Sequence, residues 1–207
     1  MDYAPVADVL TNPGNTAIGT RSFGSDASMV ADMVIKELEG LSSQGVFGAV
    51  KHFPGQGGVS GDSHDGAVTL DKSLEELMQT ELVPFQKALE NGVSFVMVGH
   101  ISVPQVVGDN TPASLSQMMV SNVLREQLGY QGIVITDAMN MGAVTGNYTA
   151  DQAAVMAVNA GVDMILMPQD YETAYNGLLQ AVQDGTISEE RLSLIHISEP
   201  TRLLSIS

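Results

Sequence analysis

The chain has 207 residues, which is enough for one domain with a hydrophobic core. It carries 24 Asp and Glu against 8 Lys and Arg, for a formal net charge of −16 at pH 7. Nucleic acids and anionic membrane surfaces are bound by clustered Lys and Arg, so this balance argues against both and suits a neutral substrate such as a sugar. The absence of Cys excludes disulfides, a thiolate nucleophile and Cys-based metal sites.

Short apolar runs alternate with longer stretches of helical periodicity. We expect strands in the apolar runs at 3–9, 46–50, 95–98, 133–135 and 164–167. Apolar spacings of three and four predict helices over 28–41, 74–89, 114–128 and 150–160. The strand runs do not alternate in polarity, which is typical of parallel strands covered on both faces, and repeated strand-helix units indicate an α/β fold. No run of about 18 apolar residues predicts a transmembrane helix, and Asp2 and Pro5 interrupt any signal-peptide core.

Several helix ends have their own signals. Ser73, with Glu76 three residues later, predicts a capping box. Pro84 is expected to kink the helix that follows, because proline lacks the amide that a helix interior needs. Gly129 and Gly161 each follow a helical stretch and are expected as C-caps.

The segment Lys-His-Phe-Pro-Gly-Gln-Gly-Gly-Val-Ser-Gly-Asp-Ser-His, residues 51–64, is the most informative part of the chain. Lys51 and His52 close one apolar run, Asp62 and His64 follow in a loop, and Asp137 ends a later run. Both barrels and open α/β sheets place their sites at such strand ends. Retaining glycoside hydrolysis needs a nucleophilic carboxylate and a group that switches from acid to base, and a histidine titrating near neutral pH suits the second task.

Structural explanations compete with this interpretation. An Asp after a strand commonly forms a turn or cap, and Asp62-Ser63-His64 alone is a common polar loop. His100 is equally compatible with lining a pocket and with a structural hydrogen bond. The glycines at 55–61 match neither the Walker pattern nor the dinucleotide fingerprint.

Taken together, three ordered motifs resemble glycoside hydrolase family 3, in particular its β-N-acetylglucosaminidase branch. They are the 51–64 segment, "ITDAMNMGA" at 135–143, which resembles the nucleophile segment, and "DYAPVADVLTNPGNTAIGTRSFGSD" at 2–26, which resembles the segment supplying a substrate-binding Arg. The resemblance covers about Asp2 to Leu192. It implies a (β/α)8 TIM-type barrel with outer helices, retention of anomeric configuration, and no metal or organic cofactor.

The resemblance also implies residue roles. Asp137 resembles the nucleophile that forms a covalent glycosyl-enzyme, and His64 resembles the acid/base of this branch, with Asp62 as the partner that orients it. The residues that resemble those holding the sugar are Arg21, Lys51 and His52.

Some features depart from the family pattern. Gln56 stands where the family often has His, and Gly58 where it often has Asp. The chain begins where about the third strand of the barrel would be, so we expect N-terminal strand-helix units to be missing and the barrel to be partial. Residues 193–207, including His196, match neither a helical pattern nor the family's continuation, and we expect a non-native tail there after a catalytic unit at 1–192.

The sequence therefore predicts a glycoside hydrolase that removes terminal β-linked N-acetylglucosamine. The alternatives are another family 3 activity, such as a β-glucosidase or a phosphorylase using inorganic phosphate, and an inactive, truncated sugar-binding fragment. Muropeptides, chitin oligosaccharides and host glycans all present the required sugar, and the oligomeric state stays open. We slightly favour a cytoplasmic location, with the cell envelope and secretion as alternatives because the N-terminus is expected to be missing.

Overall fold

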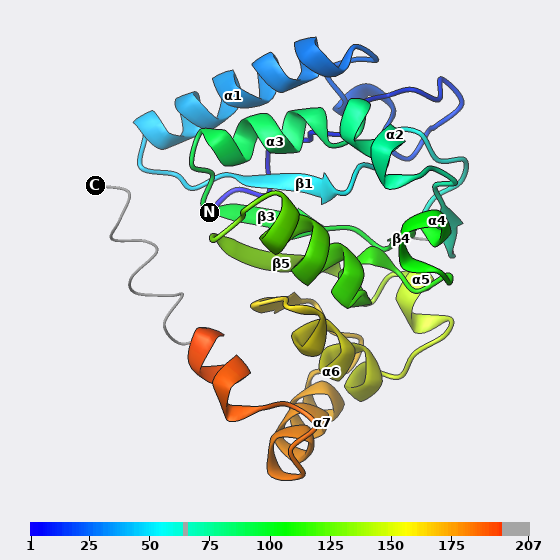
Figure 1. Cartoon of the computed structure of the whole chain (residues 1–207), viewed down its shortest axis with the longest axis vertical. Helices are drawn as coiled ribbons and strands as arrows, with labels where there is room; N and C mark the ends of the chain where they lie inside the picture. Colours follow the sequence, from blue (N-terminus) through cyan, green and yellow to red (C-terminus); the bar gives the residue numbers. More distant parts are fainter. Residues whose placement is uncertain (64–65, 196–207) are drawn as a thin grey trace.

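The computed structural model describes residues 1–63 and 66–195, and it is built around a parallel sheet (Figure 1). The strands follow one another in chain order across the sheet: β1 (Ala49–Phe53), β3 (Phe95–Val98), β5 (Ile133–Ala138) and β6 (Met164–Leu166). Every neighbouring pair is parallel. The predicted parallel α/β class is confirmed. The strands β3 and β6 lie within the expected apolar runs, whereas β1 and β5 begin within their runs and extend beyond them.

Helices cover the sheet at both of its ends. The α1 helix (Ala27–Ser43) packs beside α3 (Val83–Glu90) near β1, while α6 (Ala150–Ala160) packs beside α7 (Tyr171–Gln183) near β6 (Figure 1). A π-helix, η3 (Met118–Gln127), lies between these two pairs. The shorter elements are η1 (Gly19–Arg21), β2 (Val68–Thr69), α2 (Leu74–Gln79), β4 (Ile101–Ser102), α4 (Pro104–Val107), η2 (Ala113–Leu115) and α5 (Gly142–Thr145).

The first predicted strand is an irregular edge segment. Instead of a continuous ladder, Asp2 and Val6 form isolated parallel bridges to Gly48 and Lys51 beside β1. The amide of Lys51 donates to the Pro5 carbonyl at 3.0 Å, while Pro5 itself has no amide to donate in return. The segment is therefore fixed to β1 without forming a regular strand.

Two predicted helices differ from the structure. The capping box of Ser73 and Glu76 is confirmed at the start of α2, but the expected kinked helix over 74–89 is two helices, α2 and α3. Pro84 lies in the first turn of α3, where a missing amide costs no hydrogen bond, so the helix restarts there. The helix expected from Ser114 begins instead at Met118, after the short η2 turn.

Other helix signals are confirmed. The α6 helix has the predicted bounds, and Gly161 closes it with a φ of 111°. This left-handed conformation favours glycine, because a Cβ atom would strain it. Gly129 follows η3 with a φ of 71°, as expected for a residue that ends a helix.

The sheet buries apolar side chains on both faces. Val50, Val96 and Val134 belong to the large cluster under the helices. Ala49, Phe95 and Ile133 form a second cluster on the other face, with Met164 against it. This two-sided burial explains why the strands read as continuous apolar runs. Over the described residues, no helix is long and apolar enough to cross a membrane.

A buried carboxylate joins the last elements of the fold. Asp163, before β6, accepts from Arg125 of η3 at 2.7 Å and from Arg191 at 3.3 Å. It also accepts from the amide of Val134 in β5 at 2.9 Å. Arg191 belongs to a final helical segment, 189–195, whose Leu192 and neighbouring apolar side chains pack on a small cluster under α6 and α7. One carboxylate thus connects two helices and a strand.

Candidate active site

The structure gathers several of the predicted site residues at the carboxyl edge of the sheet. Lys51 and His52 lie in the second half of β1, Asp137 lies near the end of β5, and His100 follows β3. His52 Nε2 is 4.0 Å from Asp137 Oδ2, although the two residues are 85 positions apart in the chain. This distance is too long for a hydrogen bond, and it leaves the imidazole and the carboxylate facing each other.

A residue that the sequence analysis did not single out orients His52. The Asp8 carboxylate is fully buried, and its Oδ2 lies 2.7 Å from His52 Nδ1. An ionised carboxylate only accepts hydrogen bonds, so the proton belongs on Nδ1. Nε2 is then the ring nitrogen that faces Asp137. The signal in the sequence is a charged residue inside the apolar stretch 6–9, where an unpaired carboxylate would be costly.

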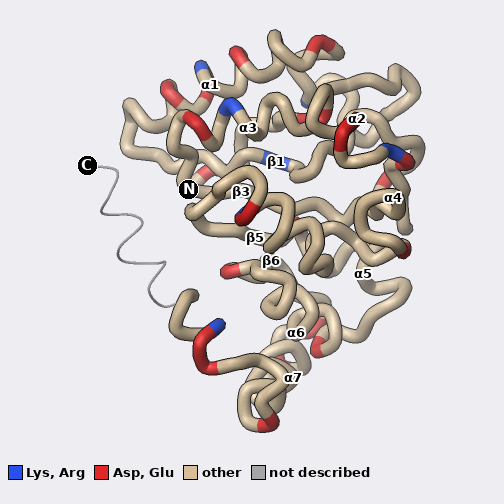
Figure 2. Tube along the Cα trace, viewed as in Figure 1, with Lys and Arg blue, Asp and Glu red and all other residues tan. Residues whose placement is uncertain are grey.

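Lys51 brings a positive charge to the same edge. Figure 2 marks a basic residue within β1, where the sequence has Lys51. Burial lowers the pKa of Lys51, and the positive charge of Arg21 lowers it further, while Asp137, Asp2 and Asp8 oppose the shift. Arg21, in η1, is exposed and donates to the Ala17 carbonyl at 2.5 Å. The arginine therefore acts on the edge through its charge.

Asp137 occupies an irregular point of β5. Ile135 pairs with Met164 and Ala138 with Leu166, so β5 has one more residue than β6 over this interval. Such a bulge re-aims the side chains within it. The carboxylate accepts from the amide of Ala138 at 2.8 Å and keeps 16% of its side chain exposed. Asp137 is thus fixed on one side and open to a ligand on the other.

The loop after β1 is closely packed against the N-terminal segment. A Cβ atom on Gly57 would lie 2.0 Å from the Val9 carbonyl oxygen, so only glycine fits there. The backbone amide of Gln56 donates to Asp8 at 2.6 Å, and its side chain donates to Ser63 at 3.1 Å. The glutamine that departs from the family pattern therefore ties the 60s loop to the same carboxylate that orients His52.

The 60s loop also contacts the segment that follows β5. The amide of Ala143 donates to the Ser63 carbonyl at 3.1 Å. Asp62, which precedes Ser63, is partly buried in this loop. The predicted acid/base His64 lies outside the described residues, so its relation to Asp62 and Asp137 stays a prediction.

A buried ion pair lies beneath the loop. Glu81 is fully buried, and Lys72 Nζ lies 2.5 Å from its Oε1. Its Oε2 has no hydrogen-bond partner among the described residues. A Cβ atom on Gly55 would lie 2.7 Å from that of Glu81. The glutamate thus packs directly against the turn that follows Lys51 and His52.

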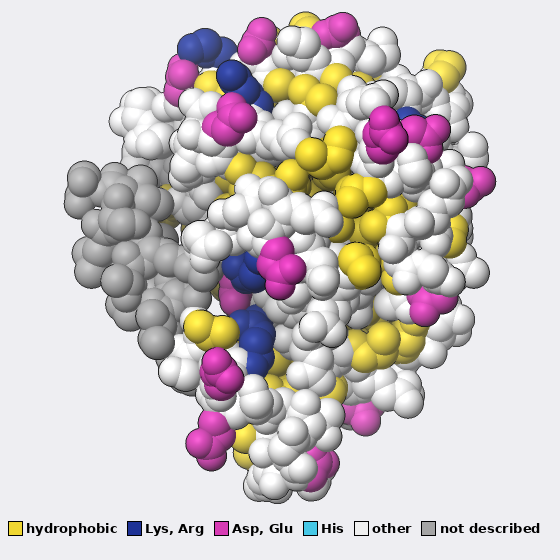
Figure 3. Space-filling model, viewed as in Figure 1, with side chains coloured by type: hydrophobic (Ala, Val, Ile, Leu, Met, Phe, Trp, Pro, Cys, Tyr) yellow, Lys and Arg dark blue, Asp and Glu magenta, His cyan; other side chains and the backbone are white. Residues whose placement is uncertain are grey.

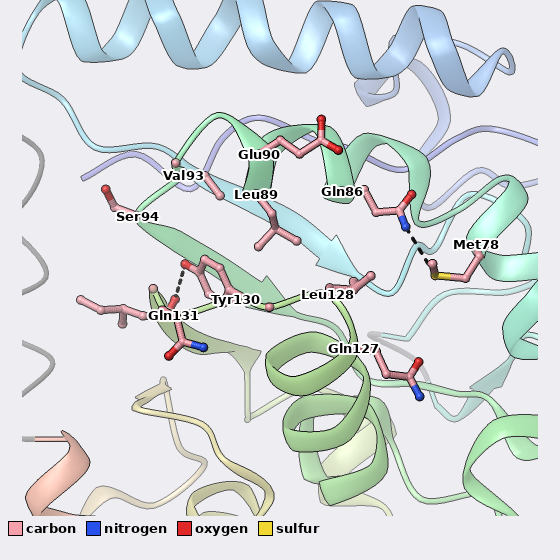
Figure 4. A pocket seen from close by; sticks show the side chains of 14 residues that line it. Met78, Gln86, Leu89, Glu90, Val93, Ser94, Gln127, Leu128, Tyr130 and Gln131 are labelled. Carbon is pink, nitrogen blue, oxygen red and sulfur yellow. Dashed lines mark hydrogen bonds between the residues drawn. The ribbon is translucent and has the colours of Figure 1, made fainter.

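A separate hollow lies at the other end of the strands. It measures about 670 Å³ and opens between α3 and η3, where apolar side chains gather (Figures 3 and 4). Its floor includes Ser94 and Ile133, at the amino ends of β3 and β5. Tyr130, which projects into it, donates to the Ile133 carbonyl at 3.1 Å (Figure 4). Because Asp137 lies at the opposite end of β5, this hollow is separate from the candidate site.

Metal ligands do not cluster in the part of the chain that the structure describes, where no three His, Asp or Glu side chains form a group suited to a cation. His52 instead forms a hydrogen bond with Asp8, and His100 forms one with Ser114.

Comparison with known proteins identifies the class. Residues 1–197 match the family described as "Glycosyl hydrolase family 3 N terminal domain". The chain therefore belongs to glycosyl hydrolase family 3, as the motifs predicted.

Individual relatives agree. The chain is 37% identical to beta-hexosaminidase LpqI of Mycobacterium tuberculosis, over 90% of this chain and 50% of that protein. It is 32% identical to a beta-N-acetylglucosaminidase/beta-glucosidase of Cellulomonas fimi, over 99% of this chain and 37% of that one. The structure of a family 3 beta-N-acetylglucosaminidase from Paenibacillus sp. superposes with a TM-score of 0.93 at 40% identity, covering 99% of this chain and 39% of that chain.

These matches confirm the expected fold, a part of a TIM-type barrel. The chain spans only part of the length of such curated relatives, from 36% of one beta-hexosaminidase to 56% of another.

Proposed function

We propose that this chain carries the catalytic centre of a retaining glycoside hydrolase that removes terminal β-linked N-acetylglucosamine. The observation that supports it most is the meeting of His52 and Asp137 at the carboxyl edge of the sheet, 4.0 Å apart, with the charge of Lys51 beside them. Family membership and the named relatives support the substrate class.

In the proposed first step, an Asp137 oxygen attacks the anomeric carbon. The bond from that carbon to the leaving oxygen breaks, its electron pair stays on the leaving oxygen, and His64 donates the proton that this oxygen needs. In the second step, water attacks the anomeric carbon, its proton returns to His64, and the carboxylate of Asp137 is released. Asp62 is assigned to orient His64.

The remaining residues are assigned to binding. His52 Nε2 is available as an acceptor for a sugar hydroxyl, because Asp8 occupies Nδ1. Lys51 and Arg21 are assigned as donors to further sugar oxygens.

A second candidate is another family 3 activity. A relative named for both beta-N-acetylglucosaminidase and beta-glucosidase supports the glucosidase, while a phosphorylase would use phosphate in place of water. The Asp62-Ser63-His64 loop favours the acetamido sugar, because it resembles the acid/base loop of the β-N-acetylglucosaminidase branch, whereas the β-glucosidase branch commonly takes its acid/base from a second domain. An inactive sugar-binding fragment is the third candidate.

The test compares aryl-group release from β-N-acetylglucosaminide and β-glucoside substrates, each with and without inorganic phosphate. We expect preference for the acetamido sugar, no need for phosphate, and loss of turnover by at least about 1,000-fold in Asp137→Asn. Asp184→Asn, an exposed cap in the α7 region, serves as a matched charge control and should keep full activity. Preference for the glucoside, dependence on phosphate, or no activity at all would each overturn the proposal in favour of the corresponding alternative.

A further inference from the structure

His100 is a buried histidine for which the proposed reaction has no use, and both of its ring nitrogens are bonded. It is 1% exposed and lies just after β3. Its Nε2 is 3.0 Å from the carbonyl oxygen of Ala138, and its Nδ1 is 2.7 Å from Ser114 Oγ. A carbonyl oxygen only accepts, so Nε2 carries the hydrogen.

Ala138 is the residue after the proposed nucleophile, and it is held from two sides. Its amide donates to the Asp137 carboxylate at 2.8 Å, while its carbonyl receives the hydrogen bond from His100. A rotation of this residue would therefore turn the amide away from the carboxylate. His100 therefore acts on Asp137 through the backbone that carries the carboxylate.

The bulge in β5 makes this support necessary. Between Ile135 and Ala138 the regular ladder to β6 is interrupted. The amide of Leu166 donates to the Thr136 hydroxyl at 2.9 Å in place of a backbone carbonyl, and the ladder resumes where Met139 donates to Leu166 at 2.9 Å. Within the interruption, the Ala138 carbonyl points to His100 on the β3 side.

The charge state of His100 fits a fixed hydrogen-bond donor. Burial lowers its pKa, and the nearby His52 acts in the same direction, while Asp137 and the backbone carbonyls oppose the shift. The neutral ring donates from Nε2 and accepts the Ser114 hydroxyl hydrogen at Nδ1, so both nitrogens are satisfied. Ser114 is itself fully buried, and its amide donates to the Gly99 carbonyl at 3.2 Å.

We propose that His100, in its neutral Nε2–H form and with Ser114 behind it, is a positioning residue that fixes Asp137 for attack through the Ala138 carbonyl. The inference rests on the proposed function for its kinetic consequence, and on geometry alone for the hydrogen bond itself.

The kinetic arm uses His100→Ala, with the acetamido aryl glycoside. We expect kcat to fall about 100-fold, the loss typical of a misplaced reacting group, with KM changed less than threefold. Added imidazole should enter the vacated space and restore part of kcat, whereas 1-methylimidazole, which has no N–H to donate, should not. Ser114→Ala, which removes only the outer bond, should lower kcat less than His100→Ala does.

Tyr130→Phe is the matched control. It also deletes a buried hydrogen bond to a β5 carbonyl, but at the amino end of the strand. We expect it to lower the unfolding temperature and leave kcat unchanged. Equal losses of kcat in both variants, equal rescue by the two imidazoles, or a kcat for His100→Ala within threefold of the parent would overturn the positioning role.

A spectroscopic arm does not depend on activity. Long-range ¹H–¹⁵N correlation spectra, with His100 identified by its loss in His100→Ala, should show a neutral Nε2–H ring at pH 7. A proton on Nδ1 alone, or a fully protonated ring, would overturn the inference. A parent protein without any hydrolysis would instead contradict the proposed function, and the spectra would then decide the hydrogen bond by themselves.

Discussion

His52 Nδ1 lies 2.7 Å from Asp8 Oδ2, and this pair connects the N-terminal segment to the first strand of the sheet. Both side chains are almost wholly buried, with 6% of His52 and 0% of Asp8 exposed. The other oxygen of Asp8 accepts from the Gln56 amide at 2.6 Å. A single carboxylate therefore sets the orientation of the imidazole and the start of the loop that follows it.

Asp8→Asn should lower kcat/KM by about 100-fold, with little change in fold. The asparagine oxygen still accepts from Gln56, but its amide group then faces His52 Nδ1. That nitrogen must become the acceptor, so the hydrogen moves to Nε2 and points at Asp137. Aryl-glycoside kinetics and the ¹⁵N spectrum of His52 measure the two effects. Asp26→Asn, at the exposed cap of α1, is the control; an unchanged His52 tautomer in Asp8→Asn would contradict the prediction.

The pKa of Lys51 should respond to its neighbours in opposite directions. Arg21→Met removes a charge that lowers the pKa of Lys51, so this pKa should rise, whereas Asp137→Asn removes a charge that raises it, so it should fall. Titration of the Lys51 ε-nitrogen by NMR measures both. Shifts of the Lys51 pKa in the same direction in the two variants would contradict this prediction.

The same residue predicts a pH dependence of stability. Because the folded-state pKa of Lys51 lies below its usual value of 10.5, the folded chain binds fewer protons there than the unfolded chain. Its contribution is unfavourable at low pH and is relieved as the pH rises through the window between the lowered value and 10.5. The free energy of unfolding, measured with urea at several pH values across this window, should rise with pH in the parent, and this contribution to the slope should be absent from Lys51→Met. Equal slopes in the parent and the variant would exclude the effect.

Lys72→Met should destabilise the fold by about 3 kcal/mol, because it leaves the buried Glu81 carboxylate without its partner. Replacing both residues, as Lys72→Met with Glu81→Leu, removes the stranded charge and should recover most of the loss. Urea midpoints of the four proteins of this double-mutant cycle give the coupling. A cost below about 0.5 kcal/mol for Lys72→Met alone would place the pair among ordinary surface ion pairs.

Asp163→Ala should cost about 3–5 kcal/mol, because Arg125 and Arg191 would both lose a carboxylate that is 4% exposed. The variant should unfold at lower urea concentration with an unchanged m-value. Lys36→Ala removes an exposed ion pair with Glu39 and should change stability by less than about 0.5 kcal/mol. Similar losses of stability in the two variants would show that Asp163 contributes no more than an exposed ion pair does.

Local signals predicted much of the fold. The bounds of α6 and the Ser73–Glu76 capping box depend on residues within one or two turns, so they could be read directly from the sequence. Pro84 was interpreted as a kink, although the structure uses it to begin α3. Choosing between a kink and a new start depends on how the helix packs, which a local pattern does not contain.

The candidate site was predicted through its strand ends, which brought Lys51, His52 and Asp137 to one edge. The pairing of Asp8 with His52 was missed because it depends on the register between the N-terminal segment and β1, across 44 residues. The bulge that places Asp137 was missed for a similar reason, since its cause lies in the pairing of β5 with β6. The roles of Asp62 and His64 stay predictions.

The order of the strands has a consequence for synthesis of the chain. Each strand of the sheet pairs with the strand made just before it, from β1 through β3 and β5 to β6. A nascent chain can therefore dock every new strand-helix unit on a surface that has already left the ribosome, without waiting for a distant partner. His52 and its Asp8 partner come together early in this order, and Asp137 joins them only after β5 emerges, so the candidate chemistry is assembled late on a scaffold that is already folded.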